Sequence, residues 1–145
     1  MEQLIMVFVF AFAAAICLQA FVYSDRLSKD GTAKETASVR ATEVIDIVKA
    51  YHGDMKKAAD KLGATFTASD KESAAGETGT LVKEYPDDGM KVTLETNEAT
   101  ATGGSNYLHQ TGKASVTEIP KEGEQAKDPI YTVDIAWQLQ EQTLK

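Results

Sequence analysis

Twenty consecutive residues without a charged side chain, Leu4 to Tyr23, constrain this chain more than any other feature. Gln19 is the only strongly polar residue among them. A helix needs about 20 apolar residues to cross the hydrocarbon core of a bilayer. A spanning segment must also satisfy its backbone hydrogen bonds internally, which favours a helix. The alternative is a buried core helix, but such helices are usually shorter and rarely uncharged throughout. We therefore expect a transmembrane helix that anchors the chain.

The residues on either side of this segment bear on its processing and orientation. A cleaved secretory signal has a basic start and an apolar stretch of about 7–15 residues. This chain instead begins Met1-Glu2-Gln3 and its apolar segment is longer, so we expect an anchor that is retained. Arg26 and Lys29 follow it with no base before it, which by the positive-inside rule places the remainder in the cytoplasm. A basic leader on a precursor would remove that preference, so the orientation stays open.

The 122 residues after Tyr23 are enough for one modest domain. They carry all 15 Lys and Arg residues and 21 of the 22 acidic ones, a net charge of −6. Nucleic-acid binding needs clustered basic side chains, so we expect no nucleic-acid partner. The single cysteine, Cys17, lies inside the apolar segment, which excludes a disulfide within one chain.

The segment from Ser24 to Gly31 is polar and suits the membrane interface and the water beyond it. Gly31 weakens a helix by about 1 kcal/mol relative to alanine. Thr32 and Glu35 have the spacing of a capping box, which would start a new helix. We favour one continuous helix weakened at Gly31 over two helices with a short break.

Residues 33–62 show a helical period. Small or apolar side chains recur at alternating spacings of four and three and form one stripe, which Ile45 and Ala59 widen. Gly63 is typical of a residue that ends a helix. A coiled coil is the alternative use of such a stripe, but small residues followed by larger ones favour packing on a sheet. The stripe comprises Ala37, Ala41, Val44, Val48, Tyr51, Met55, Ala58 and Leu62.

After Gly63 the pattern changes to alternating residues and turn residues. Two strands are expected at 80–85 and from Met90 onward, joined by the turn Pro86-Asp87-Asp88-Gly89. A short strand at 64–68 is a further candidate. Residues 69–78, with one candidate helical turn after Ser69, and residues 98–106 and 120–129 are expected to be loops.

Two more strands are expected in the last third of the chain, at 107–119 and 131–139. Gly112 suggests a bulge or an interruption in the first of them. The second has the clearest alternation, and its apolar face should lie on the helical stripe. The expected fold is therefore α+β, with a long N-terminal helix packed on an antiparallel sheet of about four strands. Its parts are the apolar helix 1–23, an amphipathic continuation 24–62, and a sheet head 63–145 that forms one globular domain with 32–62.

This architecture resembles the type IV pilin superfamily, which includes major and minor pilins and the pseudopilins of type II secretion. The residues Glu2-Gln3-Leu4-Ile5-Met6-Val7-Phe8-Val9 are similar to the glutamate-then-apolar start of mature pilins. Mature pilins typically have this glutamate in the fifth position, after a first residue released by cleavage behind a glycine. Here Glu2 follows Met1 directly, so either the start differs from the processed one or the chain is a divergent relative.

The resemblance implies a structural subunit that is a single-pass membrane protein before assembly and part of an extracellular filament or the cell envelope afterwards. Its partners would be copies of itself or related pilins, the membrane, and the pilus or secretion machinery. A carboxylate at the end of an apolar helix is costly to bury unpaired. Glu2 would therefore pair with a neighbour's N-terminal ammonium, whereas in the simpler alternative it is solvated among the lipid headgroups. The residues expected to form the assembly surface are Glu2, Leu4, Ile5, Met6, Phe8, Phe10, Phe12, Ile16, Leu18 and Phe21.

The sequence favours no catalytic or metal site. His52 and His109 lie far apart in the chain and lack a cysteine or a spaced carboxylate to complete a zinc site. Asp87 and Asp88 belong to a turn, and a calcium ion needs 6–8 oxygen ligands. A phosphate-binding loop and a nucleophile elbow are both absent from the sequence. We expect no enzymatic activity and no cofactor. A membrane-anchored monomeric binding or sensor module outside the cytoplasm is the alternative to a filament subunit.

Overall fold

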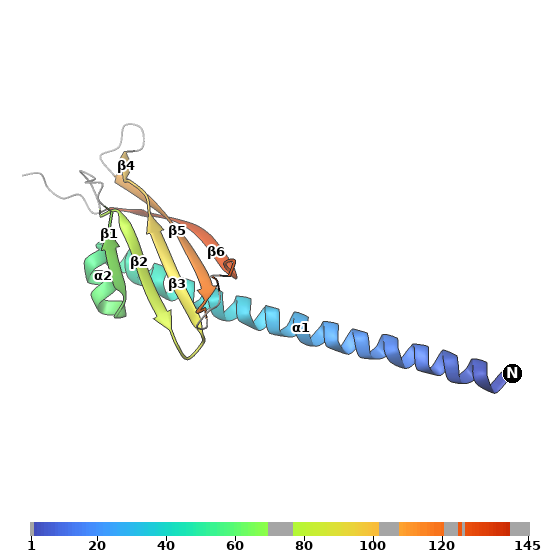
Figure 1. The fold of residues 1–145 in the computed structure, drawn as a ribbon. Coiled ribbons are helices and arrows are strands. Elements are labelled where there is room, and N and C mark those ends of the chain that lie inside the picture. The colour runs from blue at the N-terminus through green and yellow to red at the C-terminus, as the bar shows by residue number, and fades with distance from the viewer. Residues whose placement is uncertain (1, 70–76, 102–107, 121–124, 126, 140–145) are drawn as a thin grey trace, which may run out of the picture. The chain divides into compact units, whose positions relative to one another are not determined.

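The computed structural model of the chain describes residues 2–69, 77–101, 108–120, 125 and 127–139. These residues form two helices and six strands, and the chain divides into two compact units, Met1–Glu35 and Thr36–Lys145. Helix α1 continues through the boundary between them. The elements are α1 (Glu2–Ala50), α2 (Met55–Leu62), β1 (Thr65–Ala68), β2 (Gly79–Tyr85), β3 (Met90–Thr96), β4 (Thr100–Ala101), β5 (Leu108–Glu118) and β6 (Tyr131–Gln138) (Figure 1).

The first unit consists of the N-terminal part of α1. The helix passes through Gly31 without a break, which confirms the continuous helix and excludes a helix start at Thr32. The hydroxyl of Thr32 donates to the carbonyl oxygen of Ser28 at 3.0 Å, one turn earlier, instead of capping a new helix. Lys29 and Asp25 form an exposed ion pair of 2.7 Å. Every described residue up to Thr32 is exposed within the chain.

The expected continuation of this helix to Leu62 is wrong, because α1 ends at Ala50 and a separate helix begins at Met55. Between them His52 and Gly53 have φ values of 51° and 81°. Gly53 also has no room for a side chain, since a Cβ there would lie 2.3 Å from Nε1 of Trp137. Asp54 then caps α2 by accepting the backbone N–H of Lys57 at 3.1 Å. The hydrogen bond from the Lys57 ammonium, followed by this capping bond, holds the pKa of Asp54 below its usual value.

The apolar stripe is buried as expected, with one exception. Seven of its eight residues are buried, as are Ile45 and Ala59, and they lie on α1 and α2 within the second unit. Tyr51 is 36% exposed because it follows the end of α1, where the chain leaves the helical path. Gly63 ends α2 with a φ of 60°, which confirms the predicted helix end.

The strands form one antiparallel sheet in the order β1-β2-β3-β5, with β6 on the far side of β5. The four longest strands are those expected from the alternation, and the candidate strand near residue 65 is the edge strand β1. Strand β4 is unexpected because it falls in a segment predicted to be a loop. Thr100 in β4 pairs with His109 in β5. On its other side His109 pairs with Gln138 in β6, so β4 lies along the same edge of β5 as β3. Within the predicted loops, residues 70–76, 102–106, 121–124 and 126 lie outside the described residues, and so does the candidate helical turn after Ser69.

Gly112 does not mark a bulge. It pairs in continuous register with Thr96 on one side and Ile135 on the other. A Cβ at this position would lie 3.1 Å from the Trp137 ring and 2.9 Å from the carbonyl oxygen of Glu95. The glycine therefore makes room for the indole of the neighbouring strand.

One face of the sheet forms the core with the two helices. Buried and more exposed residues alternate along β3 and β6, which confirms the prediction that one face of each strand is buried. On the other face the register places Glu95, Lys113 and Asp134 in one exposed row across three strands. The buried apolar residues that the strands contribute to this core are Leu81, Met90, Val92, Leu94, Ala114, Val116, Ile135 and Trp137.

Candidate functional site

All ten residues expected to form the assembly surface lie on α1 and are exposed. The apolar ones range from Ile16, which is 52% exposed, to Phe10, which is 79% exposed. At about 100° per residue they are distributed around the whole helix instead of sharing one face. A helix that is apolar on every side is typical of a membrane span or of the centre of a larger assembly.

No part of the most apolar window of α1 is buried by the residues that the structure describes. Burying one large apolar side chain is worth roughly 1.5–3 kcal/mol, so nine such residues represent on the order of 15–25 kcal/mol. That exceeds the typical stability of a whole domain, about 5–15 kcal/mol. By its length and composition the segment could cross a membrane.

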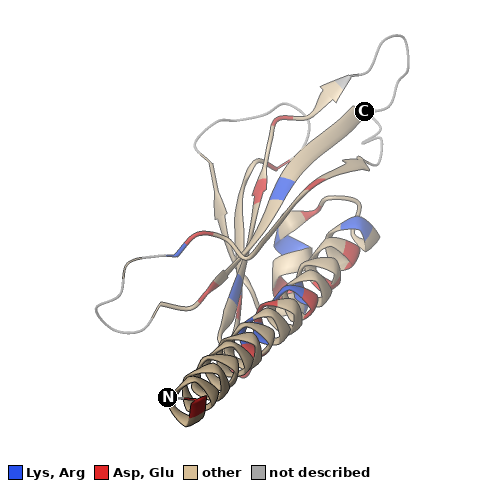
Figure 2. Ribbon diagram, turned by 90° about the vertical axis from the view of Figure 1, so that its right-hand side faces the viewer, with Lys and Arg blue, Asp and Glu red and all other residues tan. Residues whose placement is uncertain are grey.

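Glu2 lies in the first turn of α1, where a negative charge interacts favourably with the helix dipole. Its carboxylate is exposed and makes no ion pair with any residue that the structure describes. In Figure 2 the helix near the N label is tan apart from one acidic residue, and basic and acidic residues follow further along α1. Glu2 is thus the one charged side chain among the described residues that precede Leu4.

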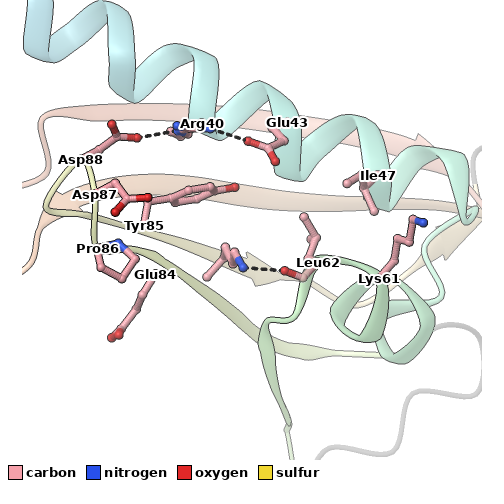
Figure 3. Close-up of a pocket in the computed structure, with 11 residues that line it drawn as sticks. Arg40, Glu43, Ile47, Lys61, Leu62, Glu84, Tyr85, Pro86, Asp87 and Asp88 are labelled. Carbon is pink, nitrogen blue, oxygen red and sulfur yellow. Dashed lines mark hydrogen bonds and ion pairs between the residues drawn. The ribbon is translucent and has the colours of Figure 1, made fainter.

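A second feature is a groove of about 310 Å³ between α1, the end of α2, and strand β2 with its following turn (Figure 3). Arg40 on α1 donates to Asp88 at 2.7 Å and to Glu43 at 3.1 Å. Its guanidinium carbon lies 4.7 Å from the centre of the Tyr85 ring. The pKa of Arg40 is raised, first through its hydrogen bond to Asp88 and then through that to Glu43.

Tyr85 is one of the residues that line this groove. Lys83, whose ammonium is 5.7 Å from the Tyr85 ring centre, donates to the carbonyl oxygen of Leu62 at 2.6 Å and so caps α2. The hydroxyl oxygen of Tyr85 is buried and makes no hydrogen bond to a described residue. Burial, followed by the nearby Glu43 carboxylate, raises the pKa of Tyr85 to about 12. These contacts hold α1, α2 and the β2–β3 turn together.

Sequence reasoning missed this groove, since Asp88 was interpreted only as a turn residue. Of the two histidines, His52 lies in the break after α1 and His109 lies in β5. Among the described residues no group of three or more His, Cys, Asp or Glu side chains could hold a metal ion.

The phenol of Tyr85 gives a pH-dependent prediction. The raised pKa means that the folded chain binds the phenol proton more tightly than the unfolded chain does. The neutral phenol therefore contributes fully to the free energy of unfolding below pH 10, and this contribution is lost as the pH rises from 10 towards 12. We expect the phenolate absorbance of the wild-type protein minus that of Tyr85→Phe to have a midpoint near pH 12. A midpoint close to the ordinary value of 10.0 would show that the phenol is solvated.

Comparison of the chain with protein-family models, with curated proteins and with solved structures found no match. The type IV pilin resemblance therefore rests on the residues around Glu2 and on the arrangement of helix and sheet.

Proposed function

We propose that this chain is the structural subunit of a type IV pilin-like filament, either a pilus or a pseudopilus, that assembles through its N-terminal helix. The observation that carries the proposal is the uncharged segment Leu4–Tyr23, whose side chains lie on a continuous helix and are exposed among the residues that the structure describes. Lipid would cover them before assembly and the helices of neighbouring subunits afterwards.

This exchange is energetically feasible because both environments are apolar. Lipid chains and packed helices solvate leucine and phenylalanine side chains comparably, so the transfer costs little hydrophobic free energy. Close packing between neighbouring helices then supplies the attraction. A segment with several charges could not make this exchange, and Leu4–Tyr23 carries no charged side chain.

The head also suits this function. Residues of α1 and α2 cover one face of the sheet, and the opposite face carries exposed polar and charged side chains, including the row of Glu95, Lys113 and Asp134. Such a face can be displayed to water while the N-terminal helices pack together. The partners would be further copies or related pilins, the membrane, and the assembly machinery.

Glu2 provides the test of this function. In a packed array of helices its carboxylate would be removed from water and would need a cationic partner, for which a neighbour's N-terminal ammonium is suited. Breaking a buried pair costs about 3–5 kcal/mol, so we expect Glu2→Ala or Glu2→Lys to reduce the filament yield at least a hundredfold. The yield is measured by shearing filaments from cells and immunoblotting the pellet.

Gln3→Ala is the matched control, because it alters the adjacent polar residue and keeps the charge of Glu2. It should assemble like the wild type. Normal filament yield from both Glu2 variants would count against a paired carboxylate and against the assembly surface that contains it.

The competing function, a membrane-anchored monomeric binding module, is favoured only by the groove beside Tyr85. The main charges of that groove are already paired within the chain, through Arg40 with Asp88 and Glu43. A chain that remains monomeric in detergent and never forms filaments would favour this alternative.

A further inference from the structure

Gln19 is the strongly polar residue that the assembly function leaves unused. It lies on α1 inside the apolar segment, its side chain is exposed, and it makes no hydrogen bond within the described part of the chain. A primary amide has two N–H donors and a carbonyl oxygen that accepts two hydrogen bonds. All of these groups therefore need partners from outside this helix.

In a membrane, the position of Gln19 leaves its amide without water as a hydrogen-bond partner. It lies four residues before Tyr23, about 6 Å inside the end of the apolar segment at 1.5 Å per residue. When the segment spans the bilayer, the amide is below the headgroups, where water is scarce and the acyl chains offer no hydrogen bonds. Polar side chains in such segments commonly bond to a polar group on another helix.

We propose that the amide of Gln19 pairs with the amide of Gln19 in a second copy of this chain while both copies are in the bilayer. Copies that share one orientation and one apolar segment place Gln19 at the same depth. A primary amide is self-complementary, so the Nε2–H of each residue donates to the Oε1 of the other. The proposal rests on the membrane-bound stage of the function above and identifies the first partner of the assembly helix.

The helical geometry defines the face through which the two copies meet. One turn to either side of Gln19 are Ala15 and Tyr23, on the same side of α1. The small side chain of Ala15 lets a facing helix approach closely. Cys17, two residues before Gln19, lies on the opposite side of the helix. A thiol at position 15 should therefore be near its counterpart in the pair, whereas the native thiol at position 17 should not.

Disulfide cross-linking of the full chain tests this arrangement. The protein is reconstituted in vesicles of phosphatidylethanolamine and phosphatidylglycerol and treated with a mild oxidant. We expect the double variant Cys17→Ala, Ala15→Cys to form a disulfide-linked dimer readily, and the wild type, with Cys17 alone, to form little.

Adding Gln19→Leu to the double variant isolates the amide. Interhelical hydrogen bonds of this kind change association by roughly three- to thirtyfold, so the cross-linked fraction should fall by a comparable factor at low protein density. Gln19→Asn keeps an amide and should restore part of the yield. Equal cross-linking through Cys17, or no effect of Gln19→Leu, would overturn the proposal.

The wild-type filament assay separates this inference from the proposed function. Filaments together with cross-linking that is insensitive to Gln19→Leu would refute the amide pair and leave the filament function standing. Amide-dependent cross-linking without filaments would support the pair and refute the filament function.

Discussion

Replacing Ala14 with aspartate is expected to remove the protein from the membrane and to abolish filament assembly. Ala14 lies at the middle of the uncharged segment, on the part of α1 that has no cover within the chain. A charged residue at the centre of a membrane helix costs about 2.5–3.5 kcal/mol during insertion, equivalent to roughly a hundredfold shift away from the inserted state. The same carboxylate would be buried without a partner in the centre of a filament. The measurement is the fraction of protein that resists alkaline extraction of membranes, together with the yield of sheared filaments.

Ser28→Asp is the control for this prediction. It adds the same charge to the same helix, but beyond the apolar segment and among existing charged residues such as Asp25 and Lys29. It should remain in the membrane fraction. Retention and assembly of Ala14→Asp at the level of Ser28→Asp would show that the apolar segment neither spans a membrane nor packs in a filament.

Replacing Trp137 with alanine is expected to destabilise the head unit by about 3–5 kcal/mol, the typical cost of removing a large core aromatic. Trp137 is only 6% exposed. Its ring occupies the space above Gly112, and its Nε1 lies against Gly53 in the break between the helices. The substitution would leave a cavity where β5, β6 and this break meet. Thermal unfolding of the full chain in mild detergent, followed by circular dichroism, measures the effect.

Gln138→Ala is the matched control, since its exposed side chain follows Trp137 on the opposite face of β6. Surface substitutions of this type usually change stability by no more than about 0.5 kcal/mol. Equal unfolding temperatures for the two variants would mean that the indole does not contribute to the core.

Much of this fold follows from residue periodicity. The stripe from Ala37 to Leu62 predicted which helical residues face the core, and only Tyr51 departs from it. Alternation predicted the β2–β3 hairpin and the buried face of β6. These patterns succeed because burial of one face is decided by side chains close together in the sequence.

The features that sequence reasoning missed depend on contacts between distant residues. The helix ends at Ala50 partly because Gly53 must pack against Trp137, which belongs to the last strand. Gly112 also packs against Trp137. The glycine that suggested a bulge is therefore needed to leave space for the indole ring. Arg40 and Asp88 are 48 positions apart, and neither has a local pattern that predicts their ion pair.

The candidate assembly surface, in contrast, could be predicted without knowledge of distant contacts. The apolar character of Leu4–Tyr23 predicted its helix and its lack of cover, because both follow from composition and length alone. The molecules that pack on the segment cannot be predicted from its composition, and Glu2 and Gln19 are the residues that bear on their identity.

Electron microscopy of sheared surface material from cells that express the chain is the decisive test of the filament function. We expect helical filaments that contain this protein, with density for residues 4–23 at the filament axis and the sheet heads outside. Cells that produce the protein in their membranes, as a detergent-soluble monomer and without any filament containing it, would refute this function.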